Sequence, residues 1–206
     1  MWHVVIPMKG TDDAKSRLDL PSSTRDRVVQ AMAADTLGAV LATPAVARVS
    51  VLSRAAGLRL DAPGASAVEV VIQPEAQWSL DRALTWFALT HTDGSSGLAV
   101  VVADLPALRA ESMADVLRHS ALHRVAMVTD TRGSGTTILA TSEPAGLRTH
   151  FGKDSAAAHR AAGAVHVPST PDTQCDVDTV EDLERARAIG LGPHTLELLV
   201  DLDLAL

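Results

Sequence analysis

Short, almost continuous apolar runs that alternate with helix-like stretches constrain the fold of this chain more than any other feature. Residues 98–103 read LAVVVA, and residues 2–8 form a similar run rich in Val and Ile. Strands that are buried on both faces read as continuous apolar runs, and they occur mostly in parallel sheets covered by crossover helices. The pattern therefore predicts an α/β fold, with a mostly parallel sheet in one three-layer domain that spans residues 1–206.

The alternation extends along the whole chain. Besides the two runs above, the expected strands are 48–52, 67–72, 124–129, 136–141 and 165–168. The expected helices run from a cap at Ser22 or Ser23 to just before Pro44, and over 80–90, 111–120, 155–162 and 180–189. At about 150 residues per domain, the length also agrees with one or at most two domains.

Composition excludes several classes of protein. The chain carries 18 Lys and Arg against 25 Asp and Glu, a net charge of −7, and only 2% aromatic residues, all of which disfavour a nucleic-acid binder. No apolar run approaches the ~20 residues that a membrane span needs. The single cysteine, Cys175, excludes an internal disulfide and a cysteine-rich zinc site. We expect a cytoplasmic protein without nucleic-acid or membrane partners.

Three cations follow the first expected strand. Lys9, Lys15 and Arg17 lie within one loop of an otherwise acidic protein, and such a group suits the phosphates of a nucleoside triphosphate. The alternative is an ordinary solvated loop, and composition alone does not separate the two. A standard phosphate-binding P-loop is excluded, because the chain contains no GxxxxGK[ST] sequence.

Carboxylates that could bind a divalent cation stand at two places. Asp104 directly follows an apolar strand, and ligands of open α/β sheets bind beyond the carboxyl ends of strands. Asp176 and Asp178 are two residues apart, so that an extended segment would present both to the same side. Such oxygen ligands suit Mg²⁺ in phosphoryl or nucleotidyl transfer. The alternative for Asp178 and Thr179 is capping of the following helix, with Thr179 and Asp182 as a capping box.

Two glycine-containing loops could approach an anionic ligand. They read GSGTT at 133–137 and FGKDS at 151–155, and glycines, hydroxyls and free backbone N–H groups suit a phosphate or carboxylate. Two tight turns are the alternative. His159 could contact a phosphate or be a partly buried histidine. A dinucleotide fingerprint, a GxSxG elbow and an activated cysteine are not indicated, which leaves attack of one phosphate on another.

Five motifs in order resemble the 2-phospho-L-lactate guanylyltransferase family, including its phosphoenolpyruvate-using bacterial branch. They are AKSRL at 14–18, ADLPAL at 103–108, DxxGSGTT at 130–137, FGxDSxxxH at 151–159 and CDVDTxxDL at 175–183. The resemblance implies a nucleotide-diphospho-sugar-transferase-like, Rossmann-like fold. It also implies transfer of GMP from GTP to a small phospho-carboxylate, with release of pyrophosphate, in the biosynthesis of the deazaflavin coenzyme F-420.

The resemblance also implies roles for single residues. Asp104, Asp176 and Asp178 would hold Mg²⁺, whereas Thr136, Gly152 and Ser155 would bind phosphoenolpyruvate or phospholactate. The three loop cations, Lys9, Lys15 and Arg17, would grip the GTP phosphates. The expected partners are thus GTP and the phospho-carboxylate. A homodimer and a handover of the labile product to a downstream enzyme are both compatible with the sequence.

One residue departs from the family pattern. Asp81 stands in SLDRAL, at 79–84, where members of the family usually have Asn. If that position contacts the nucleotide, recognition of the base or ribose would change. Gln73 and Pro74, at the end of an expected strand, could help to form a guanine pocket or could form a plain turn.

Overall fold

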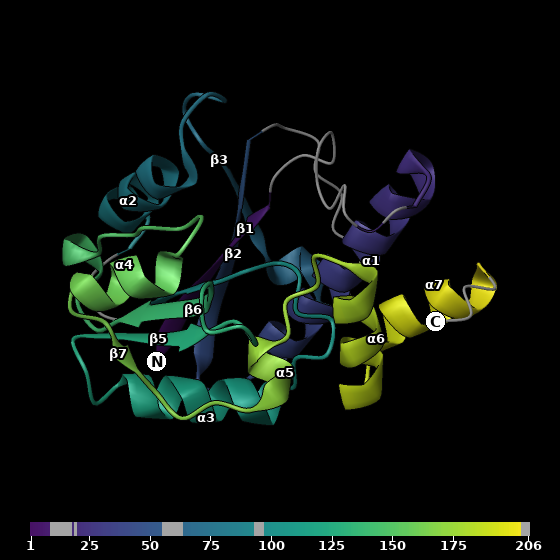
Figure 1. Cartoon of the computed structure of the whole chain (residues 1–206). Helices are drawn as coiled ribbons and strands as arrows, with labels where there is room; N and C mark the ends of the chain where they lie inside the picture. The colour runs from purple at the N-terminus through teal and green to yellow at the C-terminus, as the bar shows by residue number, and fades with distance from the viewer. Residues whose placement is uncertain (9–17, 19, 55–63, 93–96, 203–206) are drawn as a thin grey trace.

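The computed structural model describes residues 1–8, 18, 20–54, 64–92 and 97–202 (Figure 1). The predicted alternation of strands and helices is confirmed. The strands are β1 (Trp2–Met8), β2 (Val46–Ser53), β3 (Glu69–Ile72), β4 (Gly97–Val101), β5 (Val125–Thr129), β6 (Thr136–Thr141) and β7 (Val165–His166). The α-helices are α1 (Ser22–Leu41), α2 (Leu80–Thr90), α3 (Ala110–Ser120), α4 (Ser155–Ala161), α5 (Pro171–Gln174), α6 (Val180–Ile189) and α7 (Pro193–Asp201), with 3₁₀ turns η3 (Ala65–Ala67) and η4 (Pro144–Gly146).

The strands form one seven-stranded sheet in the order β3-β2-β1-β4-β6-β5-β7. β1 pairs in parallel with β2 and β4, and β2 pairs in parallel with β3. β6 runs antiparallel to both of its neighbours, so that β5 and β7 run in the same direction as β4. The prediction of a mostly parallel sheet is therefore correct. The carboxyl ends of six strands and the start of β6 share one edge, where ligands of such sheets bind.

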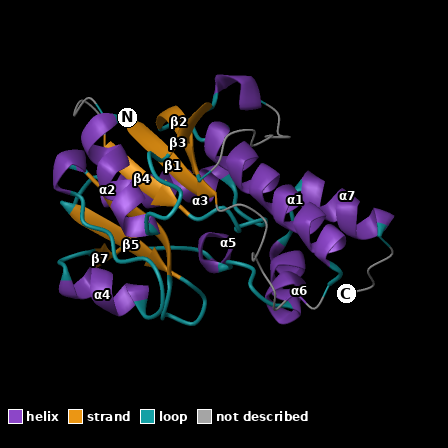
Figure 2. Ribbon diagram, turned by 90° about the horizontal axis from the view of Figure 1, so that it is seen from above, coloured by secondary structure: helices purple, strands orange, loops and turns teal. Residues whose placement is uncertain are grey.

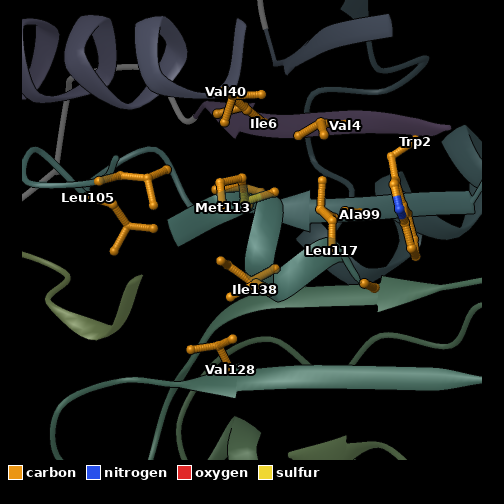
Figure 3. Close-up of a cluster of buried hydrophobic side chains, with 14 of the residues drawn as sticks. Trp2, Val4, Ile6, Val40, Ala99, Leu105, Met113, Leu117, Val128 and Ile138 are labelled. Carbon is orange, nitrogen blue, oxygen red and sulfur yellow. The ribbon is translucent and has the colours of Figure 1, made fainter. Parts of the chain in front are cut away.

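Successive residues of β1 explain why its sequence is apolar without interruption. Val4 and Ile6 pack into a cluster with Met113 and Leu117 of α3, as Figure 3 shows. Val5, between them, packs on the opposite face against residues of α2. Side chains of a strand alternate between faces, so a strand covered on both sides has no solvent-facing position. In Figure 1, α3 lies on one side of β5 and β6 and α2 and α4 lie on the other.

Helices α1, α6 and α7 form a third packing unit beside the sheet (Figure 2). Its buried core includes Val28 and Met32 of α1, Leu183 of α6 and Leu198 of α7. Helix α7 and the short α5 are not among the helices expected from the sequence. Within the ranges that the structure describes, no helix is long and apolar enough to cross a membrane.

The start of α1 differs from the prediction. The N-cap is Pro21 and, among the residues that the structure describes, no side chain caps the helix, so that Ser22 and Ser23 are its first helical residues. The end of the helix before Pro44 agrees with the prediction.

Candidate functional site

Asp104 lies three residues beyond β4, in a segment that three hydrogen bonds hold in place. The hydroxyl of Thr36, on α1, accepts the N–H of Leu105 at 3.0 Å and lies 3.2 Å from the carbonyl oxygen of Ala103. The N–H of Val177 donates to the carbonyl oxygen of Asp104 at 3.1 Å. The backbone on both sides of Asp104 is therefore tied to α1, and its own carbonyl is tied to the second acidic segment.

The second acidic segment alternates as predicted. Cys175 and Val177 are fully buried, whereas Asp176 and Asp178 are partly exposed. Burial raises the pKa of the Cys175 thiol, which agrees with a packing role for this cysteine rather than a nucleophilic one. Because the N–H of Val177 donates to the carbonyl oxygen of Asp104, the segment that carries Asp176 and Asp178 lies beside the segment that carries Asp104.

Thr179 and Asp182 cap the N-terminus of α6. The Thr179 hydroxyl accepts the N–H of Asp182, and the Asp182 carboxylate accepts the N–H of Thr179, as in a capping box. The same carboxylate also accepts the N–H of Asp178 at 3.3 Å. Thr179 thus confirms the capping interpretation, and the side chain of Asp178 is not the cap of the helix.

The predicted aspartates lie on adjacent segments but do not form a ready-made metal cluster. In the described part of the chain, no three His, Cys, Asp or Glu side chains lie close enough to hold a metal ion together. Mg²⁺ commonly takes one or two protein carboxylates and fills its other positions with water and substrate phosphates. Asp104 with its neighbours Asp176 and Asp178 supplies the hard oxygen donors that such a site needs, so the residues fit Mg²⁺ and the metal assignment stays a prediction.

The two glycine-containing loops meet at the start of β6. Thr136 and Ser155 lie with their hydroxyl oxygens 3.2 Å apart, and both residues are buried. The N–H of Ala156 donates to the carbonyl oxygen of Ser134 at 3.0 Å, which joins one loop to the other. Gly152 has φ +133°, a conformation that favours glycine, and its carbonyl accepts the N–H of Ser155. The structure therefore brings together all three residues expected to bind the acceptor.

His159 is 1% exposed and lies directly behind these hydroxyls. Its Nδ1 lies 2.9 Å from the Thr136 hydroxyl, and its Nε2 accepts the backbone N–H of His150 at 2.8 Å. Burial and the neighbouring His150 lower the pKa of His159 to about 4, although Asp81 acts in the opposite direction. Of the two interpretations of His159, the buried histidine is confirmed.

Asp81 belongs to the same region of the site. Its Oδ1 accepts the hydroxyl of Thr149 at 2.7 Å and the N–H of Phe151 at 2.9 Å. The residue that departs from the family pattern therefore supports the loop before Gly152. An Asn side chain has the same acceptor oxygen, which explains in physical terms why either residue can occupy this position.

A small pocket of about 10 Å³ lies at the carboxyl ends of β1, β2 and β3. It is lined by Pro7, Met8, Leu52, Arg54, Gln73 and Leu80. The N–H of Gln73 donates to Ser53, which continues the β2–β3 pairing, and its amide nitrogen donates to the carbonyl oxygen of Glu75. Gln73 thus lies both in a turn and at a pocket.

The cations Lys9, Lys15 and Arg17 lie outside the described residues. Two residues that shape the site escaped the sequence reasoning. In the sequence, Thr36 does not differ from other buried residues of an amphipathic helix. Its contact with the segment around Asp104 is visible only in the structure. Arg132 lies at a position of the DxxGSGTT motif where any residue is allowed. The motif therefore does not indicate its contact with Asp182.

Comparisons with known proteins support the resemblance. A family model described as "Guanylyl transferase CofC like" matches residues 2–206. A protein of Nocardia farcinica named phosphoenolpyruvate guanylyltransferase is 40% identical, over 97% of this chain and 91% of its own. A protein of Geodermatophilus obscurus with the same name is 38% identical, over 96% of this chain and 94% of its own. In structure, a protein of Desulfovibrio desulfuricans G20, described as a nucleotide-diphospho-sugar transferase, matches with a TM-score of 0.73 at 15% identity, over 98% and 95% of the two chains.

Proposed function

Because the chain belongs to the CofC-like guanylyl transferase family, we propose that it transfers GMP from GTP to the phosphate of phosphoenolpyruvate and releases pyrophosphate. The relatives that are 38–40% identical over nearly their full length bear the name of this activity. By its family resemblance, the reaction would serve the biosynthesis of coenzyme F-420. Turnover of 2-phospho-L-lactate or of another phosphorylated acceptor is the alternative for the same site.

The contact between two loops supports this proposal most strongly. The acidic segment around Asp178 and the hydroxyl-bearing loop before Thr136 are joined by Arg132, whose guanidinium contacts the Asp182 carboxylate at 3.0 and 3.1 Å. Groups suited to a metal ion and groups suited to an anionic acceptor therefore lie on connected segments. Nucleotidyl transfer needs both in one place, because its two substrates are highly charged.

The proposed roles follow this arrangement. Asp104, Asp176 and Asp178 would hold Mg²⁺, which when bound supplies positive charge to the triphosphate. Thr136, Gly152 and Ser155 would hold the phosphate and carboxylate of the acceptor. Lys9, Lys15 and Arg17 would bind the GTP phosphates. The guanine would bind over the small pocket beside Gln73, because this pocket lies at the carboxyl end of β1, and Lys9 follows β1 directly in the sequence.

The reaction requires no nucleophile from the protein. An oxygen of the acceptor phosphate attacks the α-phosphorus of GTP, a new P–O–P bond forms, and the bond from the α-phosphorus to the bridging oxygen of the β-phosphate breaks. Pyrophosphate leaves with that oxygen and with the electron pair. The protein contributes by holding the two phosphates in line and by opposing their charge repulsion.

Pyrophosphate release and product mass test the proposal. The purified protein is incubated with GTP and Mg²⁺ and, in parallel, with phosphoenolpyruvate, 2-phospho-L-lactate or no acceptor, and ATP replaces GTP in a further arm. Pyrophosphate together with a product of the mass of guanylylated phosphoenolpyruvate supports it. Product from 2-phospho-L-lactate alone would overturn the proposed acceptor, and no product from any arm with folded protein would overturn the activity.

A further inference from the structure

The imidazole of His159 has no part in the scheme above, yet it contacts the acceptor-binding loop from behind. Its Nδ1 lies 2.9 Å from the Thr136 hydroxyl, which in turn lies 3.2 Å from the Ser155 hydroxyl. With 1% exposure for His159 and 2% for Ser155, this contact is shielded from water. A buried hydrogen bond is stronger than an exposed one, and a buried donor or acceptor without a partner lowers the stability of the protein.

Hydrogen bonding determines the tautomer of His159. The backbone N–H of His150 points at Nε2 at 2.8 Å, and a backbone N–H can only donate. Nε2 must therefore carry a lone pair, and the proton of the neutral ring resides on Nδ1. It follows that Nδ1–H donates to the oxygen of Thr136.

This tautomer controls what the two hydroxyls can offer to a ligand. Thr136 and Ser155 together have two hydroxyl protons, and their mutual hydrogen bond uses one of them. Because Nδ1–H of His159 donates to the Thr136 oxygen, neither hydroxyl has to donate its proton to the imidazole. One hydroxyl proton is left to donate to an incoming ligand, which suits a phosphate or carboxylate oxygen.

The surroundings also keep the ring neutral. Burial and His150 lower the pKa of His159 to about 4, against the opposite influence of Asp81. A protonated ring would carry N–H groups on both nitrogens, and its Nε2–H would face the N–H of His150. Asp81 reinforces the geometry through the backbone, since it accepts the N–H of Phe151, the residue after His150.

We propose that His159 is a positioning residue of the acceptor site: its Nδ1–H occupies the Thr136 oxygen, so that the Thr136–Ser155 pair presents a proton to the anionic acceptor. This inference rests on the proposed function, because it assigns the acceptor to these hydroxyls. His159 does not touch the acceptor itself.

Two substitutions test the roles of the two ring nitrogens of His159 separately. In His159→Asn the amide nitrogen can take the place of Nδ1 and donate to Thr136, whereas the acceptor for His150 is lost. In His159→Gln the amide oxygen can take the place of Nε2, whereas the donor to Thr136 is lost. We expect His159→Gln to raise the KM for the acceptor about tenfold more than His159→Asn does, with little change in the KM for GTP in either variant. His119→Gln, on α3, is the matched control.

The result that would overturn the proposal is an equal acceptor KM in the Asn and Gln variants, or a GTP KM that rises together with the acceptor KM. Melting temperatures of all variants show whether each protein is folded. If both His159 variants fail to fold, phosphoenolpyruvate titrations of Thr136→Val and Thr136→Ser decide, since only serine retains the hydroxyl. Equal affinities of these two would overturn the proposal.

Nitrogen-detected NMR of the ring tests the geometry without turnover. In wild-type protein without substrates, we expect a neutral His159 with the proton on Nδ1 from about pH 5 to pH 8. A proton on Nε2, or titration near the ordinary pKa of about 6.5, would overturn the positioning role even in an active enzyme. An inactive wild-type protein that still shows the Nδ1–H tautomer would instead indicate that the proposed function is wrong.

Discussion

Arg132, in the loop between β5 and β6, contacts both carboxylate oxygens of Asp182 at the start of α6, at 3.0 and 3.1 Å. The Asp182 side chain is 4% exposed, whereas that of Arg132 is 55% exposed. Arg185 approaches the same carboxylate at 2.8 Å. One buried carboxylate therefore links the predicted acceptor loop to the segment that carries Asp178.

Replacement of Asp182 by Asn should lower the free energy of unfolding by about 1–3 kcal/mol at neutral pH. Although burial raises the pKa of Asp182, hydrogen bonds from Thr179 and Arg185 and the charge of Arg132 outweigh this and lower it. Because the pKa of Asp182 is lower in the folded state, its ionised carboxylate stabilises the fold at pH values above its unfolded-state pKa of about 3.9. This stabilisation is lost as the pH falls through the folded-state pKa. Urea unfolding should thus show a constant difference between wild type and variant from pH 7 to about pH 5, and the difference should shrink below about pH 4.

Asp115→Asn is the control for this experiment. Asp115 pairs with Arg118 on α3, and both side chains are about two-thirds exposed, so its loss should cost less than about 1 kcal/mol. A difference for Asp182→Asn that grows toward acid pH would contradict the assignment.

Much of the fold could be predicted because the strands are buried on both faces. Val4, Val5 and Ile6 have no solvent-facing alternative, so their sequence indicates a covered sheet. Helix α7 was harder to predict because its cap comes from elsewhere: Asp35, on α1, accepts the N–H groups of His194 and Thr195. A cap that lies about 160 residues away leaves no capping side chain just before the helix, where Gly192 is the N-cap residue.

Some residues of the candidate site could likewise be predicted from the sequence, and others could not. Thr136 and Ser155 stand in recognisable glycine-containing motifs, and the structure brings them together. The contact of Thr36 with the segment around Asp104 depends on how α1 crosses the sheet, and no spacing in the sequence encodes it. The sequence leaves open a nucleotide contact at Asp81, whereas in the structure its hydrogen bonds go to Thr149 and Phe151.

Asp104→Asn and Asp176→Asn should each lower turnover about 100-fold or more, because the charge that would hold the metal is removed. The fold should be little affected, since asparagine has nearly the same shape as aspartate and both aspartates are only partly buried. Pyrophosphate release gives the rates, and the melting temperature with and without Mg²⁺ gives an independent measure of metal binding. Asp201→Asn, an exposed residue of α7, should behave as wild type. Normal turnover in both site variants would refute the metal assignment.

Ser155→Ala should weaken acceptor binding more than GTP binding. The Ser155 hydroxyl is buried against Thr136, and its loss removes one donor or acceptor from the pair that faces the acceptor. A two- to tenfold rise in the KM for phosphoenolpyruvate corresponds to one hydrogen bond. Ser142→Ala, at an exposed position after β6, provides the comparison. An acceptor KM that stays the same would remove Ser155 from the acceptor site.

Asp81→Asn and Asp81→Ala should differ in their effect on the acceptor and agree in their effect on GTP. Asn retains an acceptor oxygen for Thr149 and Phe151, whereas Ala leaves both donors unmatched. Steady-state kinetics should therefore show a larger acceptor KM for the Ala variant and a similar GTP KM for both. A GTP KM that changes several-fold in the Asn variant would show instead that Asp81 takes part in nucleotide recognition.

Gly192→Ala should destabilise the protein, because the Asp35 side chain occupies the space that a Cβ would need. A Cβ at Gly192 would overlap the Asp35 carboxyl group, and its Oδ1 would be only 2.5 Å away. Asp35 is buried and caps α7 through three hydrogen bonds of 2.8–3.0 Å, to both the backbone and the ring of His194 and to Thr195. Moving it would disturb that cap, and overpacking of this kind costs about 1–3 kcal/mol.

Gly38→Ala is the matched change with the opposite expected sign. Gly38 lies inside α1, one turn beyond Asp35, and no atom of the described residues lies within 4 Å of the Cβ that would be added. Alanine in a helix interior is more favourable than glycine by about 0.5–1 kcal/mol. Urea unfolding of the two variants should place them on opposite sides of the wild type. Equal stabilities would show that α1 and α7 can separate enough to admit a methyl group, and that Asp35 does not hold the start of α7 in place.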